Sequence, residues 1–362
     1  MVKNLIQEYN LNTDFDNSTL NIEIYADEII LPTDFNSETK NIIGIACLFV
    51  PLSIKEKLFS ELVNYRCLFE ESNQWCWKYQ ECSFSQIKGG QCKEDWHKQN
   101  MCEVHHYELR NNSSHSKKSI SRNWLYYLMF NNKKNLKQIY FNILYVDLNK
   151  LRVNLFGDEK THENIYNKFF RTVLDYGIKS YFPNKRVVVK NVFHDEGHMV
   201  NHHYFPHFNL KKLNISLEDN TSIENTSIQF IDSDHRKYLK NDYESVKASH
   251  FVQLIDLILG AISQNIFYLS NDSFKKEIAM IIRPLVERLL KNPYNINSSY
   301  NYCKCQHISF FPKHSIDEAE KILTNLSYKE IRSLNRNNFY SNRKIEMPPY
   351  NPHQKTLDMW SK

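Results

Sequence analysis

Residues 250–262 read His-Phe-Val-Gln-Leu-Ile-Asp-Leu-Ile-Leu-Gly-Ala-Ile, a run that is apolar right round a helical wheel except for the carboxylate of Asp256. This pattern predicts a helix buried in a protein core rather than an amphipathic surface helix. An ionised carboxylate is costly to bury unless it is paired or binds a metal ion. Gln253 and Gly260 share the face of Asp256 at helical spacing, so the sequence predicts a polar stripe that marks a site.

A second acidic group ends the first predicted strand. Residues 20–31 have the composition and pattern of a β-strand and carry Asp27 and Glu28. Residues 41–50 predict its antiparallel partner. Some metal-dependent phosphodiester-cleaving folds place one carboxylate on a first core strand and another on a late helix, because Mg²⁺ or Mn²⁺ needs convergent oxygen ligands.

The rest of the chain alternates between predicted strands and helices. Strands are expected at 103–109, 137–146, 185–193 and 227–231, and helices at 53–69, 120–130, 163–180, 275–290, 316–326 and 328–335. This alternation after an antiparallel start predicts an α/β fold with a mixed sheet flanked by helices. Pro284 predicts a kink or a restart within the helix at 275–290.

Several short motifs occur in an order that is similar to that of a known family. They are Ile24-Tyr25-Ala26-Asp27-Glu28, Ile42-Ile43-Gly44-Ile45, His106-Tyr107-Glu108-Leu109-Arg110, Phe193-His194-Asp195-Glu196-Gly197, Phe230-Ile231-Asp232-Ser233 and Gln253-Leu254-Ile255-Asp256-Leu257-Ile258. Over residues 20–268 they resemble the family catalogued as domain of unknown function 3800. That family is similar to ribonuclease H-like folds, which carry acidic residues at strand ends and on a late helix.

The chain departs from the family pattern at three points. Residues 27–30 read Asp-Glu-Ile-Ile where the family usually has Asp-Glu-Ser-Gly, which puts substrate access in question. Residues 108–110 read Glu-Leu-Arg in place of Glu-Leu-Lys, which keeps the charge but not the ammonium chemistry. Residues 253–256 read Gln-Leu-Ile-Asp in place of Gln-Leu-Ala-Asp. None of these changes removes a carboxylate.

The resemblance implies a metal-dependent nuclease for DNA or RNA, by analogy a prokaryotic defence or mobile-element effector. In this reading Asp27 bridges two Mg²⁺ or Mn²⁺ ions, and Glu108, Asp195 and Asp256 complete their ligands. Glu28 and Gln253 would support these ligands or replace one of them. The remaining candidates are His198 as a proton shuttle, and Arg110, Lys117 and Lys118 as contacts of the phosphate backbone.

Ordinary structural roles compete with each assignment. Asp27 and Glu28 would then end a strand at the solvent, and the histidines of 194–207 would lie on a surface loop. Asp147, at the end of the strand predicted at 137–146, is a reserve metal ligand whose ordinary explanation is an Asx turn. Asp256 fits such explanations least, because a buried helix offers no solvent. The alternative function is a catalytically degenerate domain of the same fold that binds nucleic acid or a protein partner. A third possible function is a hydrolase of small phosphate compounds. Its substrate binding would depend only weakly on salt, because small phosphates release few counterions.

Composition adds limits to these hypotheses. The net charge of +5 is compatible with a nucleic-acid partner, and none of the 7 glycines forms a glycine-rich phosphate loop. No apolar segment is predicted to span a bilayer and the start is not a signal peptide, so we expect a cytoplasmic protein without a membrane partner. A homo-oligomer stays open.

The cysteines and the domain division complete the predictions. One cluster holds Cys76, Cys82, Cys92, Cys102 and His105, and another Cys303, Cys305 and His307. Reduced thiols are expected, with structural Zn²⁺ as the alternative. Residues 1–268 are predicted to form the ribonuclease H-like domain with a Cys-rich insertion at 70–105, and residues 269–362 a helical C-terminal extension with a polar tail.

Overall fold

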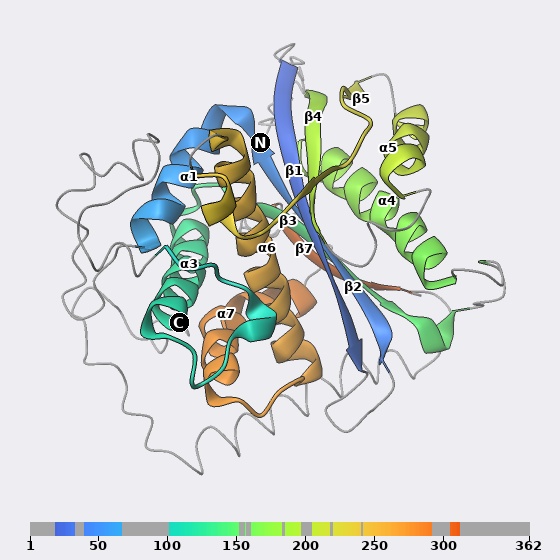
Figure 1. Ribbon diagram of the computed structural model, residues 1–362. Coiled ribbons are helices and arrows are strands. Elements are labelled where there is room, and N and C mark those ends of the chain that lie inside the picture. Colours follow the sequence, from blue (N-terminus) through green and yellow to red (C-terminus); the bar gives the residue numbers. More distant parts are fainter. Residues whose placement is uncertain are drawn as a thin grey trace, which may run out of the picture.

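A computed structural model describes residues 19–32, 40–66, 101–151, 156, 161–182, 185–196, 205–217, 220–239, 242–291 and 305–311. These residues form three layers, in which a mixed sheet lies between two groups of helices (Figure 1). The prediction of an α/β chain with a mixed sheet flanked by helices is therefore confirmed.

The sheet contains seven strands in the order β5-β4-β1-β2-β3-β7, and β6 also pairs with β4. The strands are β1 (Thr19–Pro32), β2 (Lys40–Pro51), β3 (Tyr140–Asp147), β4 (Arg186–Asp195), β5 (Thr221–Ile223), β6 (Gln229–Ile231) and β7 (Gln306–Phe311). β2 is antiparallel to both β1 and β3, which confirms the predicted antiparallel start. β4 runs parallel to β1 on its other edge, and β5 and β6 run parallel to β4.

Helices cover both faces of the sheet (Figure 1). One face carries α1 (Leu52–Arg66), α3 (His115–Lys134), α6 (Tyr243–Phe267) and α7 (Ser273–Lys291), and the other carries α4 (Thr161–Tyr181) and α5 (Phe205–Ser216). The helices predicted near 53–69, 120–130, 163–180 and 275–290 correspond to α1, α3, α4 and α7. Pro284 lies inside α7. The helices predicted at 316–326 and 328–335 lie outside the described residues.

β1 separates two hydrophobic cores. Because successive side chains of a strand point to opposite faces, Ile24 and Ala26 join the core beneath α4, while Tyr25 and Leu31 join the core beneath α6. By the same alternation Asp27 points toward α6 and Glu28 toward α4. The two adjacent acids of the predicted site therefore lie on different faces.

α6 is the buried helix that the sequence predicts. It packs on β1 and β2 and is covered by α1 and α7. By length and composition it could cross a membrane, contrary to the expectation that no segment could; 89% of the relevant stretch is buried inside the protein, as in the core helix of a globular domain. Asp256 therefore lies on a helix with little access to water, as expected.

The prediction of a strand at 103–109 is wrong. This segment is irregular and contains a single 3-10 turn, η2 (His106–Glu108). Its backbone bonds to α6 instead of to a neighbouring strand, because the N–H of Val104 donates to Gln253 at 3.0 Å and the N–H of His106 donates to Asp256 at 2.6 Å.

Two described elements come from the segment assigned to a C-terminal extension. α7 packs on α6 and α3, and β7, which the sequence did not predict, pairs with β3 in parallel. The predicted extension at 269–362 thus contributes an edge strand to the sheet. On β7, His307 stacks on Tyr176 with ring centroids 4.6 Å apart.

Most of the cysteine prediction lies outside the described residues. Cys76, Cys82, Cys92 and Cys303 are not described, nor is most of the insertion at 70–105. Cys305 is buried and Cys102 is partly buried, and neither forms a disulfide with another described cysteine. Structural Zn²⁺ at these clusters stays an untested alternative.

Candidate functional site

Asp27 and Asp195 lie next to each other on two parallel strands. The paired register of β1 and β4 runs as far as Ala26 and His194, the residues just before the two acids. Two residues earlier, the rings of Tyr25 and Phe193 stack with centroids 5.1 Å apart, on the face covered by α6. Since side chains on one strand repeat with period two, both carboxylates point to this face.

Asp256 brings a third carboxylate to the same place from the helix above. Burial raises the pKa of Asp27 well above its usual value, and the carboxylates of Asp256 and Asp195 raise it further. Burial, followed by the charge of Asp256, raises the pKa of Asp195 to about 6. Asp27 is only 6% exposed, so the repulsion acts where water screens little. The three predicted acids thus share one region of negative potential.

His105 offsets part of this negative charge. The sequence places this residue only in a cysteine cluster. Nδ1 of His105 lies 2.9 Å from Oδ2 of Asp256, and this carboxylate raises the pKa of His105 to about 9. Burial by itself would raise the pKa of Asp256, but the charge and hydrogen bond of His105, together with His106, lower it below its usual value. The signal in the sequence that could have identified His105 is the pair of histidines just before the predicted acid Glu108.

The polar stripe predicted on α6 holds the segment that carries His105. The side chain of Gln253 is fully buried. Its Oε1 accepts hydrogen bonds from Nη2 of Arg66 at 2.7 Å and from the N–H of Val104 at 3.0 Å, and its Nε2 donates to the carbonyl of Ser233 at 2.6 Å. Gln253 therefore positions this segment instead of acting as a ligand.

Gly260 supplies room for the neighbouring imidazole. A Cβ atom at Gly260 would lie 2.0 Å from the ring of His106, so only glycine admits the ring here. Burial, followed by the charge of Lys275, lowers the pKa of His106 to about 3, and the ring is therefore neutral. With Gln253 and Asp256, Gly260 completes the surface of α6 on which the segment lies.

Glu28 is not brought together with these three acids. It faces α4, where its Oε2 lies 3.3 Å from Nε2 of the buried His194. Burial lowers the pKa of His194 to about 4, and its Nδ1–H donates to the backbone carbonyl of Asp195 at 2.7 Å. Glu28 thus contributes negative charge across the sheet, and it is not placed as an alternative ligand.

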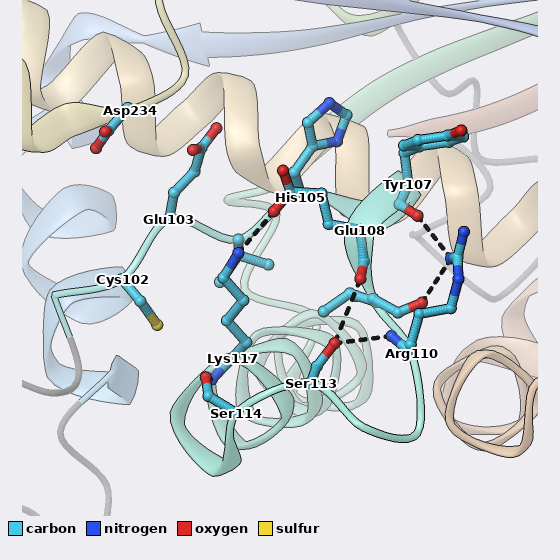
Figure 2. A network of polar contacts seen from close by, with 12 residues as sticks. Cys102, Glu103, His105, Tyr107, Glu108, Arg110, Ser113, Ser114, Lys117 and Asp234 are labelled. Carbon is cyan, nitrogen blue, oxygen red and sulfur yellow. Dashed lines mark hydrogen bonds and ion pairs between the residues drawn. The ribbon is translucent and has the colours of Figure 1, made fainter.

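Glu108 lies at the margin of the site instead of inside it. Its half-exposed carboxylate accepts a hydrogen bond from Nζ of Lys117 at 2.6 Å, which lowers the pKa of Glu108 (Figure 2). The charges of His105 and Asp256 still act on it. The carboxylate is therefore near the three acids but is paired with a lysine.

The other predicted residues divide between turns, backbone contacts and undescribed segments. Asp147 accepts the N–H of Asn149 at 3.0 Å, the Asx turn weighed as its ordinary explanation. Nζ of Lys118 donates to the carbonyl of Asn111 at 3.1 Å. His198 lies outside the described residues, so its predicted role as a proton shuttle stays a prediction.

In the part of the chain that the structure describes, no three His, Cys, Asp or Glu side chains are arranged as ligands of a single ion. Comparisons with models of protein families, with curated proteins and with solved structures each find no match. The resemblance to domain of unknown function 3800 therefore stays a prediction, and functional inference rests on the geometry and charge of the site.

Proposed function

We propose that this chain is a metal-dependent nuclease that hydrolyses phosphodiester bonds, with Asp27, Asp195 and Asp256 as its cation-binding carboxylates. The observation that carries the proposal is the convergence of these three acids, where burial and then the charges of Asp256 and Asp195 raise the pKa of Asp27. Gathering like charges in a poorly solvated place costs stability, and such arrangements concentrate at functional sites.

The arrangement of the strands supports a ribonuclease H-like domain as the setting. β1, β2 and β3 form an antiparallel meander, and β4 adds in parallel to the free edge of β1. The acids lie on β1, at the end of β4 and on the late helix α6. These are the places that the family resemblance implies for catalytic acids.

The donor chemistry of these acids suits a hard divalent cation, although their side chains are not arranged around a single ion in this structure. Mg²⁺ and Mn²⁺ prefer carboxylate oxygens, which are the donors that converge here. Oδ2 of Asp256 accepts bonds from both His105 and His106, so Oδ1 is the oxygen that would ligate. When bound, such an ion polarises a phosphate group and lowers the pKa of water.

The protein's own contribution is to orient the acids before an ion or a substrate arrives. Asp27 and Asp195 are fixed by the pairing of two central strands. Asp256 is fixed by two hydrogen bonds to residues whose segment is anchored on Gln253. Ligands held by paired strands and a buried helix lose little freedom on binding, which favours precise positioning of a reacting phosphate.

A cleavage assay tests the proposal. Labelled single- and double-stranded DNA and RNA are incubated with wild type in Mg²⁺, Mn²⁺ or EDTA. Asp195→Asn is the informative variant, because the side chain of Asp195 forms no hydrogen bond with another residue that the structure describes. Asp147→Asn is the matched control, since it also changes an acid at a strand end.

We expect cleavage by wild type and by Asp147→Asn that requires a divalent ion and that Asp195→Asn abolishes. Cleavage of no substrate, with salt-sensitive binding that is equal in wild type and Asp195→Asn, would reject the nuclease. That result would favour a degenerate domain that binds nucleic acid.

A further inference from the structure

The aromatic ring of Tyr107 is exposed beside the carboxylate site. Its residue is 73% exposed, although the preceding His106 is buried against α6. The ring centroid of Tyr107 lies 6.5 Å from that of His105, which contacts Asp256. The backbone of Tyr107 is held in place, because His106 is buried and the carbonyl of Tyr107 accepts hydrogen bonds. The ring itself stays exposed. Figure 2 shows Tyr107 on the same segment as His105.

Two cations converge on the backbone of this tyrosine. Nη1 of Arg110 and Nζ of Lys275 donate to the carbonyl oxygen of Tyr107 at 2.6 and 3.2 Å. Both charges also lie near the ring, at 5.6 and 5.8 Å from its centroid. The Arg110 contacts are drawn in Figure 2. We call Tyr107, Arg110 and Lys275 the Tyr107 patch.

The charges of Asp272 and Asp256 offset part of the positive charge of the patch without forming ion pairs with it. Lys275 is only 7% exposed, and among the described residues neither it nor Arg110 forms an ion pair with a carboxylate. Burial, followed by repulsion from Arg110, lowers the pKa of Lys275 to about 8. Two like charges that share one carbonyl favour an anion between them. Lys117 differs, because Glu108 already pairs with it.

The patch borders the three acids. The charge of Asp256 acts on Lys275, and the charges of Lys275, Asp256 and Arg110 all act on the buried His106. An exposed aromatic ring next to cations that form no ion pair with another described residue suits the binding of single-stranded nucleic acid. The ring stacks an unpaired base, and the cations hold the adjoining phosphate.

We propose that the Tyr107 patch is the binding site for a single-stranded nucleic acid, with a base on the ring of Tyr107 and the neighbouring phosphate on Arg110 and Lys275. This inference rests on the proposed nuclease, because it names the strand that the three acids would act on. The Tyr107 patch would select single strands, since a base that is paired and stacked in a duplex cannot also stack on the tyrosine.

The test is fluorescence anisotropy in EDTA, which prevents cleavage, with a labelled oligonucleotide of about 12 nucleotides, a length within the range of single-strand sites. Single-stranded DNA and RNA are compared with an abasic strand of equal length and with a duplex. The variants are Tyr107→Ala, Tyr107→Phe and Arg110→Gln. Phe208→Ala is the matched control, because it removes an exposed ring from α5 on the opposite face of the sheet.

We expect Tyr107→Ala to weaken binding of the normal strand by roughly 5- to 100-fold, the range for loss of one base–aromatic stack. The same change leaves the abasic strand unaffected, and Tyr107→Phe binds like wild type because the ring remains. Arg110→Gln weakens both strands and lowers the slope of affinity against salt by about one. Phe208→Ala has no effect.

Equal binding of the normal strand by wild type and Tyr107→Ala would overturn the inference, and so would equal losses for normal and abasic strands. The two proposals fail separately. Binding that depends on Tyr107 without any cleavage would retain the patch and reject the nuclease. Cleavage with no contribution from Tyr107 to binding would retain the nuclease and reject the patch.

Discussion

Nδ1 of His105 lies 2.9 Å from Oδ2 of Asp256, and this contact joins an irregular segment to the buried helix α6. The backbone N–H of His106 donates to the same oxygen at 2.6 Å. The carboxylate therefore orders the segment, and the segment orients the carboxylate. Stability and the proposed activity depend on the same pair.

The first prediction concerns His105→Gln in EDTA. A folded pKa of about 9 lies above the unfolded value, so the histidine stabilises the protein fully below pH 6.5 and loses this effect as the pH rises through 9. Allowing for solvent screening of this partly exposed ring, we expect a loss of about 1–2 kcal/mol in the free energy of unfolding at pH 6.5. Denaturant titration at pH 6.5 and 9.5 measures it, and a loss that does not shrink at pH 9.5 would contradict the prediction.

The second prediction is that Asp195→Asn stabilises the metal-free protein at neutral pH. The raised pKa of Asp195, about 6, means that its stabilising proton is held fully below pH 3.8 and is lost as the pH rises through 6. At pH 7.5 the ionised acid is poorly solvated and is repelled by Asp256, so asparagine should raise the free energy of unfolding by on the order of 1–3 kcal/mol. Near pH 4 the gain should almost vanish. Denaturant unfolding in EDTA at both pH values measures the difference. Equal stability of wild type and Asp195→Asn at pH 7.5 would contradict the prediction.

The third prediction concerns the addition and removal of divalent ions. If the three acids bind a cation, Mn²⁺ at a hundredfold excess over its Kd stabilises the folded protein by about 2.7 kcal/mol, which raises the Tm by several degrees. EDTA reverses the rise. Differential scanning calorimetry at pH 7.5 should show the rise in wild type and in Asp147→Asn but not in Asp195→Asn. An equal rise in all three proteins would place the ion elsewhere.

The fourth prediction separates packing from function through two glycines. A Cβ at Gly260 would lie 2.0 Å from the ring of His106, and a Cβ at Gly177 would lie 2.1 Å from the ring of Phe49 on the opposite face of the sheet. Either change to alanine should cost about 1–3 kcal/mol of stability by overpacking. Only Gly260→Ala should also weaken Mn²⁺ binding and cleavage, because it displaces the segment that holds Asp256. Similar functional losses in both variants would indicate a general effect of instability.

Local pattern in the sequence was enough to predict the central strands and the buried helix. The run at 250–262 is apolar on all sides, and it lies inside α6 (Tyr243–Phe267). The strands predicted at 20–31 and 41–50 match β1 and β2 to within a residue or so. Asp256 was identifiable because a carboxylate on such a helix needs a partner, and the partner proved to be His105.

The features that the sequence did not reveal depend on contacts between distant residues. The segment at 103–109 has β-like composition, but its N–H groups bond to Gln253 and Asp256 about 150 residues away. β7 is short and becomes a strand by pairing with β3. Lys275 is ordinary in sequence and acquires meaning only because its Nζ reaches the carbonyl of Tyr107. No local periodicity encodes such pairings.

The most direct test of the account is the rate of Mn²⁺-dependent cleavage at pH 7.5 by wild type, Asp27→Asn and Asp147→Asn. Asparagine at residue 27 keeps the shape of the side chain and can still accept the N–H of Glu28, but it removes the charge that a cation needs. The account predicts that Asp27→Asn remains folded and cuts at least about a thousandfold more slowly than wild type, while Asp147→Asn cuts normally. Cleavage by Asp27→Asn at the wild-type rate, or cleavage by wild type that persists in EDTA, would contradict the claim that these carboxylates carry out metal-dependent hydrolysis.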